Sequence, residues 1–134
     1  VGLVSKKGGY LCNMNEIELQ FTKYLVNQFL AQFQQNVKEG KIRFVKRRSE
    51  KIDCLKNLGW LPSTLFEHLA ENLTYSNWLS GPMKDHNGTT GDIWEFGIII
   101  SDTEYYVKFK DINGTKCLSF HEPRKECFYR LEGI

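Results

Sequence analysis

The dipeptide Asn113-Gly114 constrains the fold of this chain more than any other feature, because it separates two β-prone segments. Asn-Gly favours a two-residue type I′ turn, in which both central residues adopt a positive φ. Such a turn pairs Ile112 with Thr115 and sets the register of both strands outward from that pair. The sequence therefore predicts an antiparallel hairpin formed by residues 104–111 and 115–122.

Side chains alternate across a strand, so the predicted register divides the hairpin into two faces. Three cross-strand pairs share a polar face: Tyr106–His121, Lys108–Ser119 and Lys110–Cys117. Two pairs share an apolar face: Phe109–Leu118 and Val107–Phe120. The apolar face is the expected core side, and the polar face is left open to solvent or to a ligand.

A third strand is predicted over residues 93–100, where β-prone residues precede another turn. If residues 102–103 form that turn, the polar face gains two residues: Glu95 next to Lys110, and Gly97 next to Lys108. The same register adds three residues to the apolar face: Trp94, Phe96 and Ile98. These strands together predict a small antiparallel sheet.

Helical signals fill the first half of the chain. Asn15 and Glu18 have the spacing of a capping box, in which each side chain accepts a hydrogen bond from the other residue's backbone. Apolar residues then recur at helical spacing up to Gly40, a natural helix end: Ile17, Phe21, Tyr24, Leu25, Phe29, Phe33 and Val37. The pattern predicts a long N-terminal helix.

Two shorter helices are expected behind Ser49 and Thr64, which are candidate N-caps. Residues 75–92 show little periodicity and many turn-forming residues, which is typical of a long loop. Helices come first and strands follow, so the predicted class is α+β, with N-terminal helices packed on a small antiparallel sheet. At 134 residues and 41% hydrophobic composition, the chain is expected to form one domain over residues 1–134.

Composition also sets expectations about location and cofactors. No apolar run approaches the roughly 18 residues of a membrane span. No apolar core of a signal peptide follows Lys6 and Lys7, so a cytoplasmic protein is expected. The four cysteines contain no C-x-x-C pair, and the three histidines lack the spacing of metal ligands. The sequence therefore predicts neither a metal site nor a cofactor.

Positive charge is concentrated in one short stretch, although the formal net charge is only +2. Seven basic residues lie close together there: Lys38, Lys41, Arg43, Lys46, Arg47, Arg48 and Lys51. Such clusters favour nucleic acids, because binding to phosphates releases condensed counterions. Under this interpretation four of them bind RNA: Arg43, Lys46, Arg47 and Arg48. The alternatives are a solvated face and a docking surface for an acidic protein.

The polar face of the predicted sheet carries the residue types that RNA cleavage by the 2′-hydroxyl requires. A base must take the proton of that hydroxyl, an acid must protonate the leaving 5′-oxygen, and a cation must stabilise charge on the phosphate. His121 or Glu95 can serve as the base, and Lys108 can serve as the cation. Tyr106 lies beside them in the predicted register. Because the nucleophile belongs to the RNA, this reaction requires no metal.

An ordered set of short motifs resembles the MqsR-like mRNA-interferase toxins. The motifs are Gly81-Pro82, Asp85, Gly91-Asp92-Ile93-Trp94-Glu95-Phe96-Gly97, Tyr106-Val107-Lys108 and Cys117-Leu118-Ser119-Phe120-His121. With the helical region 37–59, the resemblance covers about residues 33–123, and residues 1–13 lie outside it. It implies a RelE-like ribonuclease architecture, sequence-selective cleavage of messenger RNA and inhibition by a cognate antitoxin protein.

The resemblance carries site residues over one by one. Tyr106 matches the active-site tyrosine of the family. Glu95 stands where the best-known members have a glutamine, and His121 stands where they have a lysine. Lys84 is the nearest counterpart of a further lysine in the loop before the sheet, and it is assigned to RNA binding. Histidine and glutamate are ordinary acid–base residues, so the resemblance implies that cleavage is retained.

Three hypotheses follow from the sequence. The first is a metal-independent endoribonuclease toxin, and the second is a non-catalytic RNA- or protein-binding module of the same fold. The third is a phage or mobile-element protein that grips an acidic partner. Lys110 and Ser119 fit all three hypotheses, because antiparallel sheets commonly have one polar face exposed to solvent. The first two differ in whether Tyr106, Lys108 and His121 converge on one open cleft or are covered by the N-terminal helix.

Overall fold

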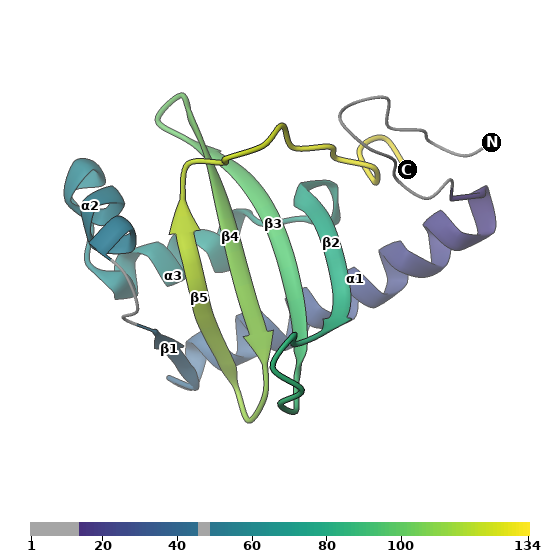
Figure 1. Ribbon diagram of the computed structural model, residues 1–134, viewed down its shortest axis with the longest axis horizontal. Coiled ribbons are helices and arrows are strands. Elements are labelled where there is room, and N and C mark those ends of the chain that lie inside the picture. Colours follow the sequence, from purple (N-terminus) through teal and green to yellow (C-terminus); the bar gives the residue numbers. More distant parts are fainter. Residues whose placement is uncertain (1–13, 46–48) are drawn as a thin grey trace.

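The computed structural model of the protein describes residues 14–45 and 49–134. These residues form helices on one side of a five-stranded sheet (Figure 1). The elements in chain order are α1 (Glu16–Lys38), β1 (Ile42–Phe44), α2 (Ser49–Leu58), α3 (Pro62–Asn72), a 3₁₀ turn (Tyr75–Asn77), β2 (Trp78–Lys84), β3 (Asp92–Ile100), β4 (Thr103–Asp111) and β5 (Thr115–His121). The predicted α+β class is confirmed.

Helix α1 begins at the predicted capping box. The Asn15 side chain accepts a hydrogen bond from the Glu18 backbone at 2.8 Å, and the Glu18 carboxylate accepts one from the Asn15 backbone at 3.3 Å. The helix lies behind the sheet in Figure 1 and packs aromatic rings against it. The Phe29 ring lies 4.7 Å from that of Trp94, and the Phe33 ring lies 4.8 Å from that of Phe109. These contacts form the centre of the core.

The first turns of α1 differ from the prediction. Ile17, Phe21 and Tyr24 are 81%, 60% and 56% exposed. They belong to the predicted apolar stripe, but this end of the helix extends past β2 and has no strand beneath it (Figure 1). Helix α3 also differs, because it begins at Pro62 rather than behind Thr64. Proline suits the first helical position, since it lacks the N–H that would stay unbonded there.

The sheet is mixed and larger than the predicted three-stranded antiparallel one. Its strand order is β1-β5-β4-β3-β2, with β1 parallel to β5 and the other neighbours antiparallel. Strand β2 occupies part of the segment predicted as a loop, residues 75–92. The strand was not predicted because it contains Gly81-Pro82, a dipeptide typical of turns. Proline is nevertheless tolerated in an edge strand such as β2. A Cβ on Gly81 would lie 2.5 Å from the Ile93 carbonyl oxygen, so the close approach of the two strands requires glycine.

The hairpin of β4 and β5 confirms the predicted pairs far from the turn and corrects those near it. Tyr106 pairs with His121, Val107 with Phe120 and Lys108 with Ser119, as predicted. Nearer the turn the pairs are Phe109–Cys117, Lys110–Lys116 and Asp111–Thr115. The predicted pairs Lys110–Cys117, Phe109–Leu118 and Ile112–Thr115 are therefore wrong. A bulge between the two sets of pairs accounts for the offset of one residue.

Strand β1 explains why the turn is longer than predicted. Thr115 donates its backbone hydrogen bond to Lys41, at 2.9 Å, instead of to Ile112. Residues 112–114 therefore form a three-residue loop, in which Asn113 and Gly114 keep the positive φ values that the prediction required, 48° and 105°. The bulge then lets Leu118 and Ser119 both reach the polar face, while Cys117 is fully buried.

The turn between β3 and β4 falls one residue earlier than predicted, at Ser101 and Asp102, whose φ values are 51° and 66°. Glu95 therefore pairs with Lys108 instead of Lys110, and Gly97 pairs with Tyr106 instead of Lys108. A shift of two residues keeps every side chain on its predicted face, because strands have a period of two. Three side chains accordingly are buried in the core as predicted: Trp94, Phe96 and Ile98.

Residues 122–134 cross the sheet on the side away from α1 and then turn around β2 (Figure 1). The Tyr129 hydroxyl donates to Glu104 at 2.7 Å, and the Leu131 side chain is fully buried. The Ile134 main-chain oxygen accepts hydrogen bonds from Tyr75 and Lys23, at 2.9 and 3.1 Å. This segment covers one end of the polar face. Within residues 14–45 and 49–134, no helix has the length and apolar character to cross a membrane.

Candidate active site

The polar face of β3, β4 and β5 lies on the side of the sheet opposite α1. The α1 rings Phe29 and Phe33 contact Trp94, Phe96 and Phe109, so these three side chains point to the face of the sheet that α1 covers. The N-terminal helix therefore does not cover Tyr106 or His121, as the enzyme hypothesis requires. Residues 122–134 instead pass over this end of the face, where the Tyr129 hydroxyl lies against Gly97, the cross-strand partner of Tyr106, and Arg124 contacts His121.

Glu95 is the centre of a hydrogen-bonded group that spans three strands. Its two carboxylate oxygens accept hydrogen bonds from the Ser80 hydroxyl on β2 and the Tyr106 hydroxyl on β4. Burial and the hydrogen bond to Glu95 raise the pKa of the Tyr106 phenol. Tyr106 therefore keeps its proton at neutral pH and remains a hydrogen-bond donor. Both contacts hold the carboxylate in one orientation.

His121 lies against the other side of Tyr106. The two rings are stacked, with centroids 5.1 Å apart and an interplanar angle of 29°. His121 Nδ1 lies 2.8 Å from the main-chain oxygen of Glu122. A carbonyl oxygen only accepts, so Nδ1 carries the proton of this hydrogen bond. The other ring nitrogen, Nε2, accepts a hydrogen bond from the Arg124 guanidinium at 3.4 Å, so a ligand would reach it only by displacing Arg124.

Lys108 lies between these groups on β4, opposite Glu95 on one side and Ser119 on the other. Among the described residues, no carboxylate forms an ion pair with its ammonium group. Its charge is thus available to a phosphate near Tyr106 and His121. The structure brings together all four residues predicted as catalytic: Glu95, Tyr106, Lys108 and His121.

The residues predicted to bind RNA do not form one cluster in the described structure. Arg43 is exposed on β1, next to Lys116 of β5. Its neighbours Ile42 and Phe44 pack on the core, so strand alternation points Arg43 toward the polar face. Lys84 ends β2 opposite Asp92, three residues along β3 from Glu95, and does not join the group. Lys46, Arg47 and Arg48 lie outside the described residues.

Two residues of the site were not predicted from the sequence. Ser80 belongs to the segment predicted as a loop, and Arg124 follows the last predicted strand. The apolar pair Trp78-Leu79 was the one signal for a strand at Ser80, and Gly81-Pro82 outweighed it. Nothing in the sequence pointed to Arg124.

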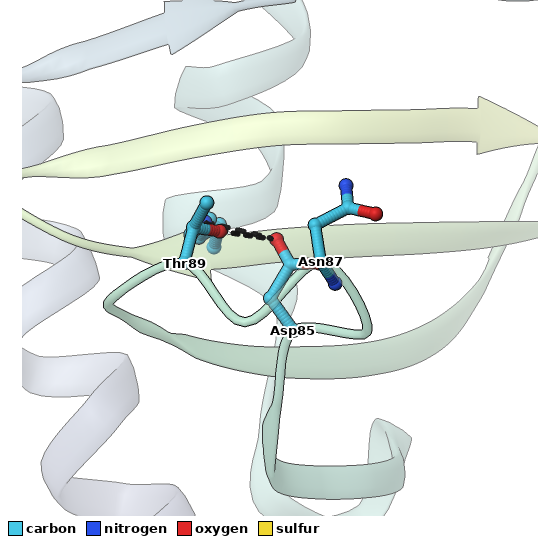
Figure 2. A network of polar contacts seen from close by, with 4 residues as sticks. Asp85, Asn87 and Thr89 are labelled. Carbon is cyan, nitrogen blue, oxygen red and sulfur yellow. Dashed lines mark hydrogen bonds and ion pairs between the residues drawn. The ribbon is translucent and has the colours of Figure 1, made fainter.

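Lys110 forms a buried ion pair, in contrast to the solvent-facing role predicted for it. Its ammonium lies 2.9 Å from an Asp85 carboxylate oxygen and donates to the Thr89 hydroxyl at 2.6 Å. The Asp85 carboxylate also accepts a hydrogen bond from the Asn87 backbone at 3.0 Å and one from the Thr89 hydroxyl at 3.1 Å, the second of which is drawn in Figure 2. These contacts attach residues 85–91 to β4. The hydrogen bond from Lys110, followed by that from Asn87, holds the pKa of Asp85 well below its usual range.

The Asp85–Lys110 pair should make stability depend on pH. Because the folded pKa of Asp85 lies below its unfolded value of about 4, the pair stabilises the fold above that pH and loses its effect as the pH falls. Asp85→Asn should therefore lower the free energy of unfolding at pH 7 more than at pH 3, as measured by urea unfolding. Asp53→Asn, on an exposed position of α2, is the control. Equal losses from Asp85→Asn at both pH values would show that the pair does not stabilise the fold.

The described ranges contain no group of three or more His, Cys, Asp or Glu side chains that could hold a metal ion together. The acid–base groups of the polar face are instead joined to each other through Tyr106. The chain matches no protein-family model, no curated protein and no solved structure. A functional inference for this protein therefore rests on the chemistry of the polar face and on the resemblance of its motifs.

Proposed function

We propose that this chain is a metal-independent endoribonuclease that cleaves messenger RNA, a toxin of the MqsR type with a RelE-like architecture. One observation carries the proposal: Glu95, Tyr106 and His121 are in contact on a face that α1 leaves uncovered, with Lys108 beside them. A base, an acid, a neutral hydrogen-bond donor and a cation in one place are the groups that cleavage by the 2′-hydroxyl uses.

The reaction breaks one bond of the RNA and forms another. The 2′-oxygen attacks the adjacent phosphorus, and the bond from phosphorus to the 5′-oxygen breaks. Of Glu95 and His121, one takes the proton from the 2′-hydroxyl and the other gives a proton to the leaving 5′-oxygen. Their strands flank β4, and Tyr106 of β4 lies between the two side chains. A phosphodiester placed over Tyr106 would have one of the two groups on each side.

Lys108 and Tyr106 serve the phosphate in this proposal. The Lys108 ammonium stabilises the charge that develops on the phosphate oxygens. Tyr106 keeps its proton, because its pKa is raised, and would donate its hydrogen bond to the phosphate in place of Glu95 when RNA binds. Its ring also offers a surface on which an unpaired base of single-stranded RNA can stack.

The partners follow from the same proposal. The substrate is messenger RNA, whose phosphates would contact Arg43 at the edge of the polar face and the basic residues that follow β1. A cognate antitoxin protein would neutralise the enzyme, and both would act in the cytoplasm. These assignments extend the motif resemblance, and Arg43 is the described residue that supports them.

The proposal is tested by incubating the purified protein with single-stranded RNA in EDTA. Cutting is expected, since the nucleophile, the acid, the base and the cation are all supplied without a metal. Binding without cutting would instead assign the chain to the alternative class, an RNA-binding module of the same fold.

A further inference from the structure

A depression of about 520 Å³ lies on the polar face, between residues 85–90 and the hairpin of β4 and β5. This volume falls within the roughly 300–1,000 Å³ of typical small-ligand sites. The ion pair between Asp85 and Lys110 forms one wall and holds the loop in place. Figure 2 shows this loop over the strands, with the Asp85 carboxylate directed toward Thr89. Three side chains of this wall, Asp85, Thr89 and Lys110, bond to one another.

The lining of the depression combines three kinds of chemistry. Ile112 and Leu118 supply half-buried apolar surface, and the exposed Asn87 supplies an amide. Lys116 supplies a positive charge that no described carboxylate pairs, because Asp85 is already bonded to Lys110. An apolar surface, an amide and an unpaired cation suit a ligand with a flat ring, a polar ring edge and a phosphate.

The depression adjoins the candidate active site through the β-bulge. The bulge turns both Leu118 and Ser119 toward the polar face, so Leu118 lines the depression while Ser119 lies opposite Lys108. Lys116 has Arg43 as its neighbour on β1, which extends the positive charge along the same edge. A chain of phosphates passing Lys108 would therefore reach Lys116 next.

We propose that this depression binds one nucleotide of single-stranded RNA next to the cleaved phosphate. The base lies against Leu118 and Ile112, its polar edge meets the Asn87 amide, and its phosphate meets Lys116. The inference rests on the proposed RNA-cleaving function and adds the place where the flanking base is selected. Discrimination among bases arises because Asn87 offers both a donor and an acceptor, which the four base edges satisfy to different degrees.

Binding of DNA oligonucleotides separates this proposal from the cleavage chemistry, because an oligonucleotide without 2′-hydroxyls cannot be cut by the proposed route. Fluorescent oligo-dA, oligo-dC, oligo-dG and oligo-dT are titrated with wild type, Asn87→Ala and Lys116→Ala, and anisotropy reports binding. We expect wild type to prefer one base. Asn87→Ala should weaken that preferred complex roughly three- to tenfold and reduce the preference. Lys116→Ala should weaken all four complexes and lower the salt slope by about 0.7.

Two control variants sharpen the test. His86→Ala changes an exposed residue of the same loop that does not line the depression, and Lys56→Ala removes an exposed lysine from α2. Neither should alter base preference or salt slope. Equal affinity of wild type for the four oligonucleotides, or an unchanged preference in Asn87→Ala, would overturn the proposal even if RNA is cut. Conversely, a preference that depends on Asn87 without any cutting of RNA would support this site and overturn the proposed cleavage.

Discussion

Replacing His121 with alanine is expected to reduce the rate of RNA cleavage by about 10²–10⁴-fold, which is the usual contribution of one general acid or base. The side chain stacks on Tyr106 and its Nε2 faces Arg124, which bound RNA would displace, so the loss of the ring removes one proton-transfer group. The ratio kcat/KM on a synthetic RNA measures the effect. Growth inhibition on induced expression should weaken in parallel.

The fold should survive this change, because His121 is half-exposed and lies outside the hydrophobic core. Urea unfolding checks this expectation. His86→Ala, which removes a histidine from an exposed loop position, should keep the full rate. Full toxicity and normal cleavage in His121→Ala would place the reaction elsewhere and favour the binding-module hypothesis.

Glu95→Gln should reduce cleavage by a similar factor, about 10²-fold or more, if the carboxylate transfers a proton. Glutamine keeps the size of the side chain and can still accept a hydrogen bond from Tyr106 or Ser80, but it cannot take up a proton. Initial rates measured against pH would show the loss of one titrating group.

Ser80→Ala is the matched control for that experiment. It removes one hydrogen bond to the same carboxylate and leaves its charge, so it should cost much less than Glu95→Gln. A Glu95→Gln enzyme that keeps most of its rate would show that the carboxylate only orients Tyr106. The proton transfers would then belong to His121 and another group.

Local rules predicted much of the fold correctly. The capping box of Asn15 and Glu18 depends on residues three apart, and the structure contains it. The predicted pairing of Tyr106 with His121 also holds, because the β-bulge offsets a hairpin loop one residue longer than predicted. The faces of β3 are right even though its turn lies at Ser101, because the register error is an even number of residues.

The errors come from contacts between segments far apart in the sequence. Lys41 takes the backbone hydrogen bond of Thr115, so β1 lengthens the hairpin loop and a bulge compensates for it. The hairpin sequence alone contains no sign of that partner. The apolar spacing of α1 likewise continues through Ile17 and Phe21, but only the size of the sheet decides where the helix face stops being covered.

In the candidate site too, the residues set by local strand alternation were predicted, and those that depend on distant segments were not. Glu95, Tyr106 and Lys108 were predicted because β3 and β4 alternate regularly, and His121 was predicted because it lies in the part of β5 beyond the bulge. Ser80 was missed, because its strand is interrupted by glycine and proline and pairs with irregular register. Lys110 was assigned to solvent, because its partner Asp85 comes from a loop whose path over β4 the sequence does not reveal.

The chemistry of cleavage can be measured with two RNA oligonucleotides that differ in one atom. Once the cleaved position is mapped, one oligonucleotide carries a 2′-deoxy nucleotide there and the other is all ribose, and both are incubated with the purified protein in EDTA. The all-ribose RNA should be cut to fragments with 2′,3′-cyclic phosphate and 5′-hydroxyl ends, and the single deoxy substitution should stop the cut at that position. Cutting at the deoxy position, or cutting that EDTA stops and magnesium or zinc restores, would contradict attack by the 2′-hydroxyl on this face.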